Sequence, residues 1–148
     1  MIEKYLTFDL NYIIKNTTID NHSFLNKYFD DFIPIELYLN KDNYKTVEVT
    51  NKNDEIVARN FFVVKGDLVH INATAIDDKY QKMGINQNIK KILINYCKEN
   101  NIKKITCNVR ESNKNSLNSL IHTGFIINYN VDLFYPDGEK KIALYFMV

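Results

Sequence analysis

The chain of 148 residues has few of the features that mark disulfide-linked, secreted or membrane-bound proteins. Its only two cysteines are Cys97, in a helical pattern, and Cys107, in a strand pattern, where both are most simply small apolar residues. No apolar stretch approaches the roughly 20 residues that span a bilayer. The N-terminus also lacks a basic region followed by an apolar core. We therefore expect a cytoplasmic protein without disulfides or a membrane partner.

The charge is also nearly balanced, with 19 basic and 18 acidic residues and a formal net charge of +1. The lysines are scattered or occur in pairs, such as Lys90-Lys91 and Lys103-Lys104, which is typical of solvated faces. No sequence-wide field favours nucleic acid or an acidic membrane, so we expect neither as a partner. The length predicts one domain over residues 1–148. A domain of this size buries a sufficient core without disulfides or metal ions.

The N-terminal third contains a strand pattern followed by a helix pattern. Apolar residues alternate with polar ones over residues 6–14, which predicts a half-buried strand. Apolar residues recur at helical spacing over residues 24–32, in a helix that Asp20 or Asn21 can cap and that ends before Pro34. The segment 35–43 fits either a short strand or a second helix.

The middle of the chain reads as hairpins. Strand patterns at 46–50, 56–64 and 68–76 are separated by polar turns at 51–54 and 65–67, which predicts an antiparallel meander of three strands. An amphipathic helix follows and ends at Asn100-Asn101. The next strand pattern, centred on Ile105, Cys107 and Val109, should run parallel to its predecessor because a helix joins the two.

The last part of the chain predicts a short helix and a hairpin. Ser112 can cap a helix that carries Leu117, Leu120 and Ile121 and ends at Gly124. Strand patterns then cover residues 125–135 and 140–148. The intervening Pro136-Asp137-Gly138 is a strong turn signal, so these two strands should form a hairpin.

Residues 76–86 form the most informative junction, because they join an apolar strand to the amphipathic helix through a turn that holds one of only four glycines, Gly84. The first turn of a helix offers unpaired backbone N–H groups and the positive end of the helix dipole to an anion such as phosphate. Gly84 would let that ligand approach the backbone closely. A second feature, the segment Asn113 to Phe125, gives this common type of turn more weight.

Together these two segments resemble the GNAT acyltransferase family. Its pyrophosphate loop runs Gln/Arg-x-x-Gly-x-Gly/Ala, and its later helix reads Asn, then Ala three residues on, Tyr seven on, and Gly-Phe at its end. The matching residues are Gln81, Gly84, Asn113 and Gly124-Phe125. The departures are Asn86 for the second loop Gly/Ala, Ser116 for the Ala and Leu120 for the Tyr. The resemblance covers residues 45–148, and Leu120 matters most because that Tyr commonly serves as the general acid.

The resemblance implies an α/β (α+β) fold: a mixed, mostly antiparallel sheet of about seven strands flanked by helices, with a splayed parallel pair of strands around the acyl-CoA site. It implies acetyl-CoA as cosubstrate and no metal. The backbone of Ile76, with Ala75 nearby, would pair with the pantetheine amides. The pyrophosphate would lie against backbone N–H groups of Gln81, Lys82, Met83, Gly84, Ile85, Asn86 and Gln87. Asn113 would lie near the cofactor, or serve only as a helix cap, and the Lys82 side chain would face a phosphate or solvent.

Acyl transfer to an amine requires a base that takes the amine's proton. Some family members hold a Glu fourteen residues before the first loop glycine, and here that position is His70, whose ordinary pKa near 6.5 suits the role. Glu48 is a second candidate base; each has the alternative of being an ordinary strand residue. His122 is better explained as a helix-end cation. Leu120 cannot donate a proton, so the acid would be water, another tyrosine such as Tyr129, or absent.

We predict an acetyl-CoA-dependent N-acetyltransferase that moves an acetyl group directly to the amine of a small molecule or peptide. A catalytically silent acyl-CoA-binding module and an α/β domain without CoA are the alternatives, since fold alone does not decide function. The acceptor stays open, because core packing accounts equally well for the aromatic residues that could line its pocket: Tyr38, Tyr44, Tyr129 and Phe134. A homodimer is also left open.

Overall fold

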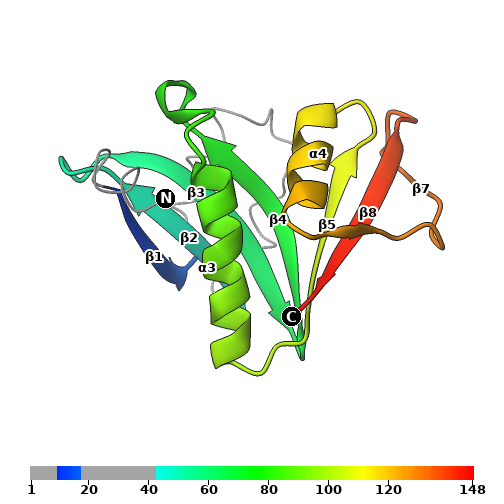
Figure 1. Ribbon diagram of the computed structural model, residues 1–148, viewed down its shortest axis with the longest axis horizontal. Helices are drawn as coiled ribbons and strands as arrows, with labels where there is room; N and C mark the ends of the chain where they lie inside the picture. The colour runs from blue at the N-terminus through cyan, green and yellow to red at the C-terminus, as the bar shows by residue number, and fades with distance from the viewer. Residues whose placement is uncertain (1–9, 18–42) are drawn as a thin grey trace.

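A mixed sheet forms the centre of the part of the chain that the computed structural model describes, residues 10–17 and 43–148 (Figure 1). Within these residues the strands are β1 (Asn11–Asn16), β2 (Tyr44–Thr50), β3 (Ile56–Lys65), β4 (Leu68–Ile76), β5 (Lys104–Arg110), β6 (Ile126–Ile127), β7 (Leu133–Phe134) and β8 (Lys140–Met147). They form one sheet in the order β1-β2-β3-β4-β5-β8-β6, with β7 also paired to β8. The predicted helix over 24–32 and nearly all of segment 35–43 lie outside the described residues.

The predicted meander of three strands is confirmed. β2 pairs antiparallel with β3, and β3 pairs antiparallel with β4. The Asn51 side chain accepts hydrogen bonds from the backbone N–H groups of Asn53 and Glu55, which stabilises the first turn. β1 pairs with the other edge of β2. It ends at Asn16, two residues beyond the predicted end of the strand over 6–14, of which residues 6–9 lie outside the described part.

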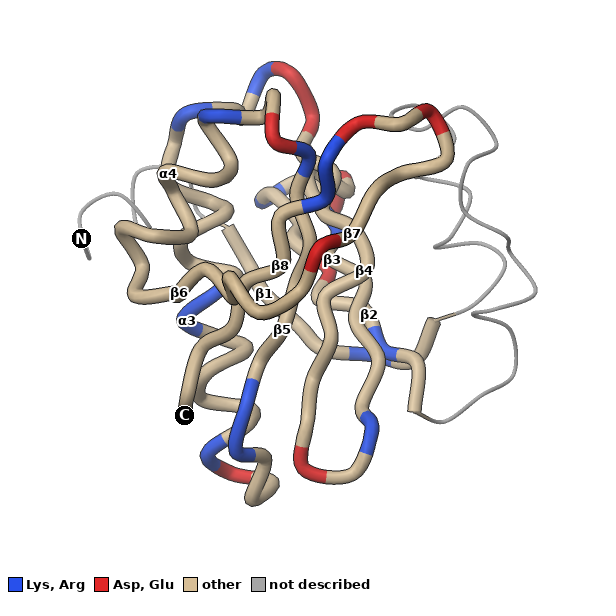
Figure 2. Tube along the Cα trace, turned by 90° about the vertical axis from the view of Figure 1, so that its right-hand side faces the viewer, with Lys and Arg blue, Asp and Glu red and all other residues tan. Residues whose placement is uncertain are grey.

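In the described part of the chain, two α-helices cover one face of the sheet, as Figures 1 and 2 both show. They are α3 (Ile85–Glu99) and α4 (Lys114–His122), and a 3₁₀ turn, η3 (Asp78–Tyr80), precedes α3. The apolar side of α3 is buried against the sheet as the sequence periodicity predicts. Its residues Ile85, Ile89, Leu93 and Cys97 join a core that also contains Val47, Phe62, Val69, Ile71, Ile105 and Leu144.

The parallel pair β4–β5 is joined only along its first half. Pairing runs from Leu68↔Lys104 to Ile71↔Cys107, whereas β4 stays paired to β3 as far as Ile76. β5 likewise stays paired to β8 as far as Arg110. The two strands diverge at an irregularity in the β3–β4 register, where Asn72 is an extra residue on β4, and such bulges bend a strand. The predicted splayed pair and the predicted fold class are therefore confirmed.

Two local predictions for the C-terminal part are wrong. The single strand expected over 125–135 is divided into β6 and β7, because the Asn128 side chain accepts the backbone N–H of Asn130 and forms a turn between them. The residue that caps α4 is Asn113, whose side chain accepts the Ser116 N–H, and not Ser112. The predicted hairpin turn at 136–138 is confirmed, with the Gly138 N–H donating to the Tyr135 carbonyl.

Candidate functional site

The loop between β4 and α3 has an unusual backbone. Lys82 has a φ of 63° and Gly84 a φ of 81°, so both lie in the left-handed region, which is rare for a residue with a side chain. Gly84 is the N-cap residue of α3 and has no side chain that could accept a hydrogen bond from the helix. The N–H groups of the first helical turn point out of the helix. The Gln81 side-chain amide donates to the Ile76 carbonyl and to Asp78, which ties the loop to the end of β4.

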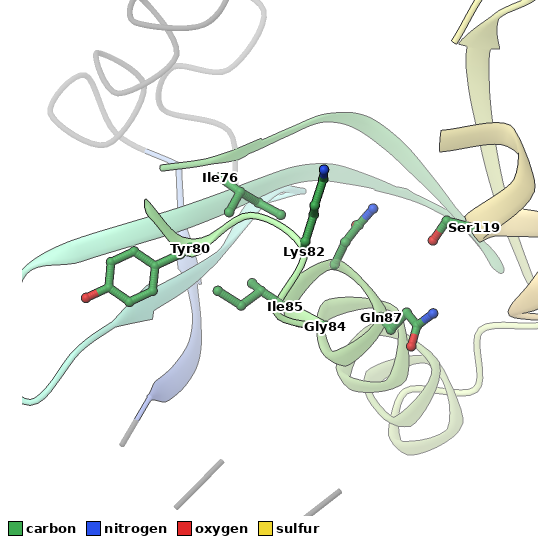
Figure 3. A pocket seen from close by; sticks show the side chains of 8 residues that line it. Ile76, Tyr80, Lys82, Gly84, Ile85, Gln87 and Ser119 are labelled. Atoms are coloured by element: carbon green, nitrogen blue, oxygen red, sulfur yellow. The ribbon is translucent and has the colours of Figure 1, made fainter. Parts of the chain in front are cut away.

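A pocket of about 330 Å³ lies at this junction, between the end of β4, the loop, the start of α3 and one residue of α4 (Figure 3). Its lining residues are Ile76, Tyr80, Lys82, Gly84, Ile85, Asn86, Gln87 and Ser119. Six of these are among the positions that the sequence predicts to bind the cofactor. The other four predicted positions, Ala75, Gln81, Met83 and Asn113, do not line it.

Sequence reasoning missed Tyr80 and Ser119. The Tyr80 hydroxyl accepts a hydrogen bond from the Asn51 side chain of the β2–β3 turn, which fixes the ring at one end of the pocket. Ser119 faces the α3 N-terminus from α4 (Figure 3). It lies three residues after Ser116, so the two serines share one side of α4, and this polar side is the signal that could have indicated it.

α4 contributes structure rather than a proton donor. Leu120 is 4% exposed and packs in the core with Phe125. The Asn113 side chain is occupied by capping the helix, as one of its two predicted roles requires. His122 lies in the last turn of α4, at the expected helix end, and is exposed. Tyr129 is 84% exposed in the turn between β6 and β7 and does not line the pocket.

His70 lies on the paired part of β4, one residue before the last β4–β5 pair, and does not line the pocket. Its Nδ1 is 2.7 Å from the hydroxyl oxygen of Thr106, its partner on β5. Burial, with the nearby charges of Lys65 and Lys141, lowers the pKa of His70 below its usual 6.5, so the imidazole is neutral at pH 7. Alternation along β4 and β5 places His70 and Thr106 on the sheet face away from α3, because the adjacent Val69, Ile71, Ile105 and Cys107 belong to the helix-side core.

Glu48 is held in an ion-pair cluster and not exposed. Two N–H groups of Arg59 donate to one carboxylate oxygen at 3.1 and 2.8 Å, and Lys15 donates to the other at 3.0 Å. Burial alone would raise the pKa of Glu48, but these hydrogen bonds and charges lower it below its usual value. A carboxylate so well paired is a weak base, so the geometry favours a stabilising role for Glu48.

Both cysteines are buried, and burial raises the pKa of each thiol to about 11. They are therefore protonated at neutral pH and unsuited to nucleophilic catalysis. Within residues 10–17 and 43–148, no three His, Cys, Asp or Glu side chains gather in a way that could hold a metal ion.

Lys and Arg lie among Asp and Glu on the loops near the start of α4 (Figure 2), where Arg110 pairs with Asp137 and Glu139 at 2.7 and 3.0 Å. None of the helices that the structure describes is long and apolar enough to cross a membrane.

Many solved structures share the fold of this chain. Ribosomal-protein-S18-alanine N-acetyltransferase from Escherichia coli superposes with a TM-score of 0.73 at 18% identity, over 93% of this chain and 94% of that one. An acetyltransferase from Bacillus subtilis in complex with CoA gives 0.72 at 19%, over 94% and 99%. Spermidine N-acetyltransferase from Vibrio cholerae in complex with CoA and spermine gives 0.73 at 12%, over 92% and 95%.

At these identities the structures establish the fold, and among curated protein sequences none matches the chain significantly. The family assignment comes from the sequence profile of the acetyltransferase (GNAT) family, which matches residues 14–125. That match spans β1 to the Gly-Phe end of α4, including the loop and the splayed strands. The chain therefore belongs to the acetyltransferase (GNAT) family.

Proposed function

We propose that this chain is an N-acetyltransferase that moves the acetyl group of acetyl-CoA directly to the amine of a small molecule or peptide. The observation that carries the proposal is the coincidence of three features. β4 leaves β5 after Ile71, the loop after β4 places Lys82 and Gly84 in left-handed geometry, and a pocket opens where that loop begins α3.

The main chain would do most of the cofactor binding. Beyond Ile71 the edge of β4 that faces β5 is not paired to it in the described structure, so residues 72–76 can pair with the amides of an extended pantetheine chain. The first turn of α3 would hold the pyrophosphate, because its N–H groups and helix dipole favour an anion. Lys82 and Gln87 line the same pocket, which suits a polyanionic ligand.

The two substrates would approach from opposite faces of the sheet. The phosphate pocket is beside α3, whereas His70 lies on the other face, at the point where β4 and β5 separate. A thioester lying in the opening between the strands would present its carbonyl carbon to an amine on the His70 face. Both substrates would be bound at once, which is the requirement for direct transfer.

His70 would act as the general base. With Nδ1–H donating to the Thr106 hydroxyl, the lone pair on Nε2 is free to take a proton. The amine nitrogen attacks the thioester carbon and loses its proton to Nε2, after which the C–S bond breaks and the thiolate leaves with the electron pair. Solvent protonates that thiolate, because Leu120 offers no donor.

The test is thiol release from acetyl-CoA with spermidine, aminoglycosides, amino acids and an alanine-initiated peptide. The first and last acceptors are chosen because the similar structures include a spermidine enzyme and a ribosomal-protein-alanine enzyme. His70→Gln should lower kcat about 10²-fold or more and leave acetyl-CoA affinity unchanged. His122→Gln is the matched control, because it removes an exposed imidazole of α4.

The pH profile gives a second readout. Since the pKa of His70 is lowered, kcat/KM of the wild type should rise with pH through a midpoint below 6.5, and His70→Gln should lose this limb. Equal turnover in both proteins would eliminate His70 as the base. No acetyl-CoA binding by calorimetry would refute the proposed function altogether.

A silent acyl-CoA-binding module is the second candidate, favoured by one observation: the family's usual proton donor is replaced by Leu120, which is buried. Tight acetyl-CoA binding without turnover across the whole acceptor panel would support this candidate over the enzyme.

A further inference from the structure

Lys90 is the one lysine of the described chain that is buried, with 6% of its surface exposed. It lies in the second turn of α3, and its neighbour Lys91 is exposed. The expectation that these two lysines form a solvated pair is therefore wrong for Lys90. A cation in this place is expensive, because it is removed from water and lies near the positive end of the helix dipole.

The structure gives the Lys90 ammonium one hydrogen bond within the described chain, from Nζ to Oδ1 of Asn86 at 2.8 Å. An ammonium has three N–H donors and no acceptor, so the Asn86 atom that meets it must be the carbonyl oxygen. The Asn86 NH₂ group is then left with its two donors. Because Asn86 lines the pocket at the start of α3, these donors are available to a ligand there.

The position of Asn86 makes this pair informative. It stands where the family's loop has a second small residue, which would leave the phosphate in contact with backbone alone. Here a side-chain amide occupies that place, with a buried cation behind it. Both the amide donors and the positive charge suit a phosphate group, and none of the described residues that line the pocket is acidic.

We propose that Asn86 is a side-chain ligand of the acyl-CoA pyrophosphate and that Lys90 is its positioning residue, which fixes the amide with its NH₂ toward the phosphate and adds a buried positive charge. This inference rests on the proposed function, because it requires acyl-CoA at this pocket. It assigns to this chain a phosphate ligand that acts through a side chain rather than through the loop backbone.

A pH dependence of binding follows. Burial lowers the pKa of Lys90 to about 8, and the Cys107 thiol of β5 acts on it in the opposite direction. That thiol has a pKa of about 11, Asn86 and Ser119 do not ionise, and Lys82 is the other cation at the pocket. Only the charged form of Lys90 attracts phosphate and donates a charge-assisted hydrogen bond to Asn86. Acetyl-CoA affinity should therefore fall as the pH rises from 7 to 9, and binding near pH 8 should take up protons.

Calorimetry of acetyl-CoA binding to the full chain tests the proposal, with Lys90→Met and, as the matched control, Lys91→Met. Both remove one charge from adjacent positions, one buried and one exposed. Lys90→Met should weaken binding about tenfold or more, as expected for the loss of a hydrogen bond to a charged group. It should also abolish the proton uptake, measured in buffers of different ionisation enthalpy, whereas Lys91→Met should change neither.

The other arms separate this role from a structural one. In a double-mutant cycle, Lys90→Met should cost less affinity when Asn86 is already alanine, because only the attraction of the Lys90 charge for phosphate is then lost. S-acetyl-pantetheine has no phosphates, so it should bind the wild type and Lys90→Met with equal affinity. The inference would be overturned if Lys90→Met bound acetyl-CoA with the same Kd as the wild type, or if the two substitutions had additive effects in the cycle. Either result would leave the proposed function intact. A loss confined to kcat would also overturn it, by placing Lys90 at the thioester.

Discussion

Replacing Arg59 with methionine should destabilise the protein far more than its position on a strand suggests. The Glu48 and Arg59 side chains are 7% and 11% exposed, so the substitution leaves a buried carboxylate without its main partner. Breaking a buried pair from one side typically costs 3–5 kcal/mol. Lys15 remains 3.0 Å from the other carboxylate oxygen, so we expect about 3 kcal/mol, the lower end of that range.

The matched control is Lys15→Met, which removes the same charge from the same carboxylate. The Lys15 side chain is 47% exposed, and exposed ion pairs contribute at most about 1 kcal/mol. Urea unfolding followed by circular dichroism gives both free energies, and it does not depend on tryptophan, which the chain lacks. If Arg59→Met costs no more than Lys15→Met, the argument from burial is refuted.

A second variant checks the mechanism. Adding Glu48→Gln to Arg59→Met should recover part of the lost stability, because a buried amide costs less than an unpaired buried charge. Further destabilisation by the added change would contradict this. Glu48→Gln alone should reduce turnover no more than its loss of folded protein explains, which separates a stabilising carboxylate from a catalytic base.

The pH dependence of this effect has a definite sign. Hydrogen bonds from Arg59 and Lys15 hold the pKa of Glu48 below its usual value despite burial, so this group stabilises the fold above its unfolded pKa. That contribution is lost as the pH falls through the lower, folded-state value. Arg59→Met lacks most of it at every pH. The difference in stability between wild type and variant should therefore hold down to about pH 4.5, the usual pKa of the carboxyl, and narrow as the pH falls below that.

Two glycine substitutions, each with a glycine control, test the packing behind α4 and the pocket at the start of α3. Gly124→Ala should lower the melting temperature more than Gly138→Ala: both have positive φ, 107° and 92°, but only at Gly124 would the new methyl group meet a neighbour, Phe146, at 3.1 Å. Equal losses, measured by thermal unfolding, would mean that the Phe146 ring moves aside freely. Gly84→Asp should weaken acetyl-CoA binding at least tenfold, about 1.4 kcal/mol, whereas Gly66→Asp in the β3–β4 turn should not. Normal binding by folded Gly84→Asp would place the site elsewhere.

The parts of the fold that sequence predicts well are those governed by short periods. The meander follows from alternation and polar turns, and α3 follows from apolar residues three and four apart. The same rules fail at Asn128, whose turn is made by a single side-chain hydrogen bond inside an otherwise strand-like segment. They also fail at Ser112 and Asn113, because either residue type can cap a helix and only the geometry shows which one does.

The site was harder to predict because its parts meet through tertiary structure. The divergence of β4 from β5 coincides with the bulge at Asn72, and nothing in the local sequence marks that residue as extra. Lys90 looks like half of a surface pair, since helical periodicity alone does not show how wide the buried side of α3 is. Ser119 reaches the pocket only because α4 folds back beside the start of α3.

The difference between recognition by backbone groups and recognition by side chains explains why the fold and the family can be assigned whereas the acceptor cannot. The structures compared above keep this fold at 12–19% identity, which is expected if the cofactor is held largely by backbone groups that do not depend on side-chain identity. On the proposed function, the described pocket would be the phosphate end of such a site. The acceptor would meet the opposite face of the sheet, around His70 and the opening between β4 and β5, where side chains rather than backbone decide which amine fits. Substitutions on that face should therefore change the acceptor preference, and substitutions at Asn86 and Lys90 the cofactor affinity.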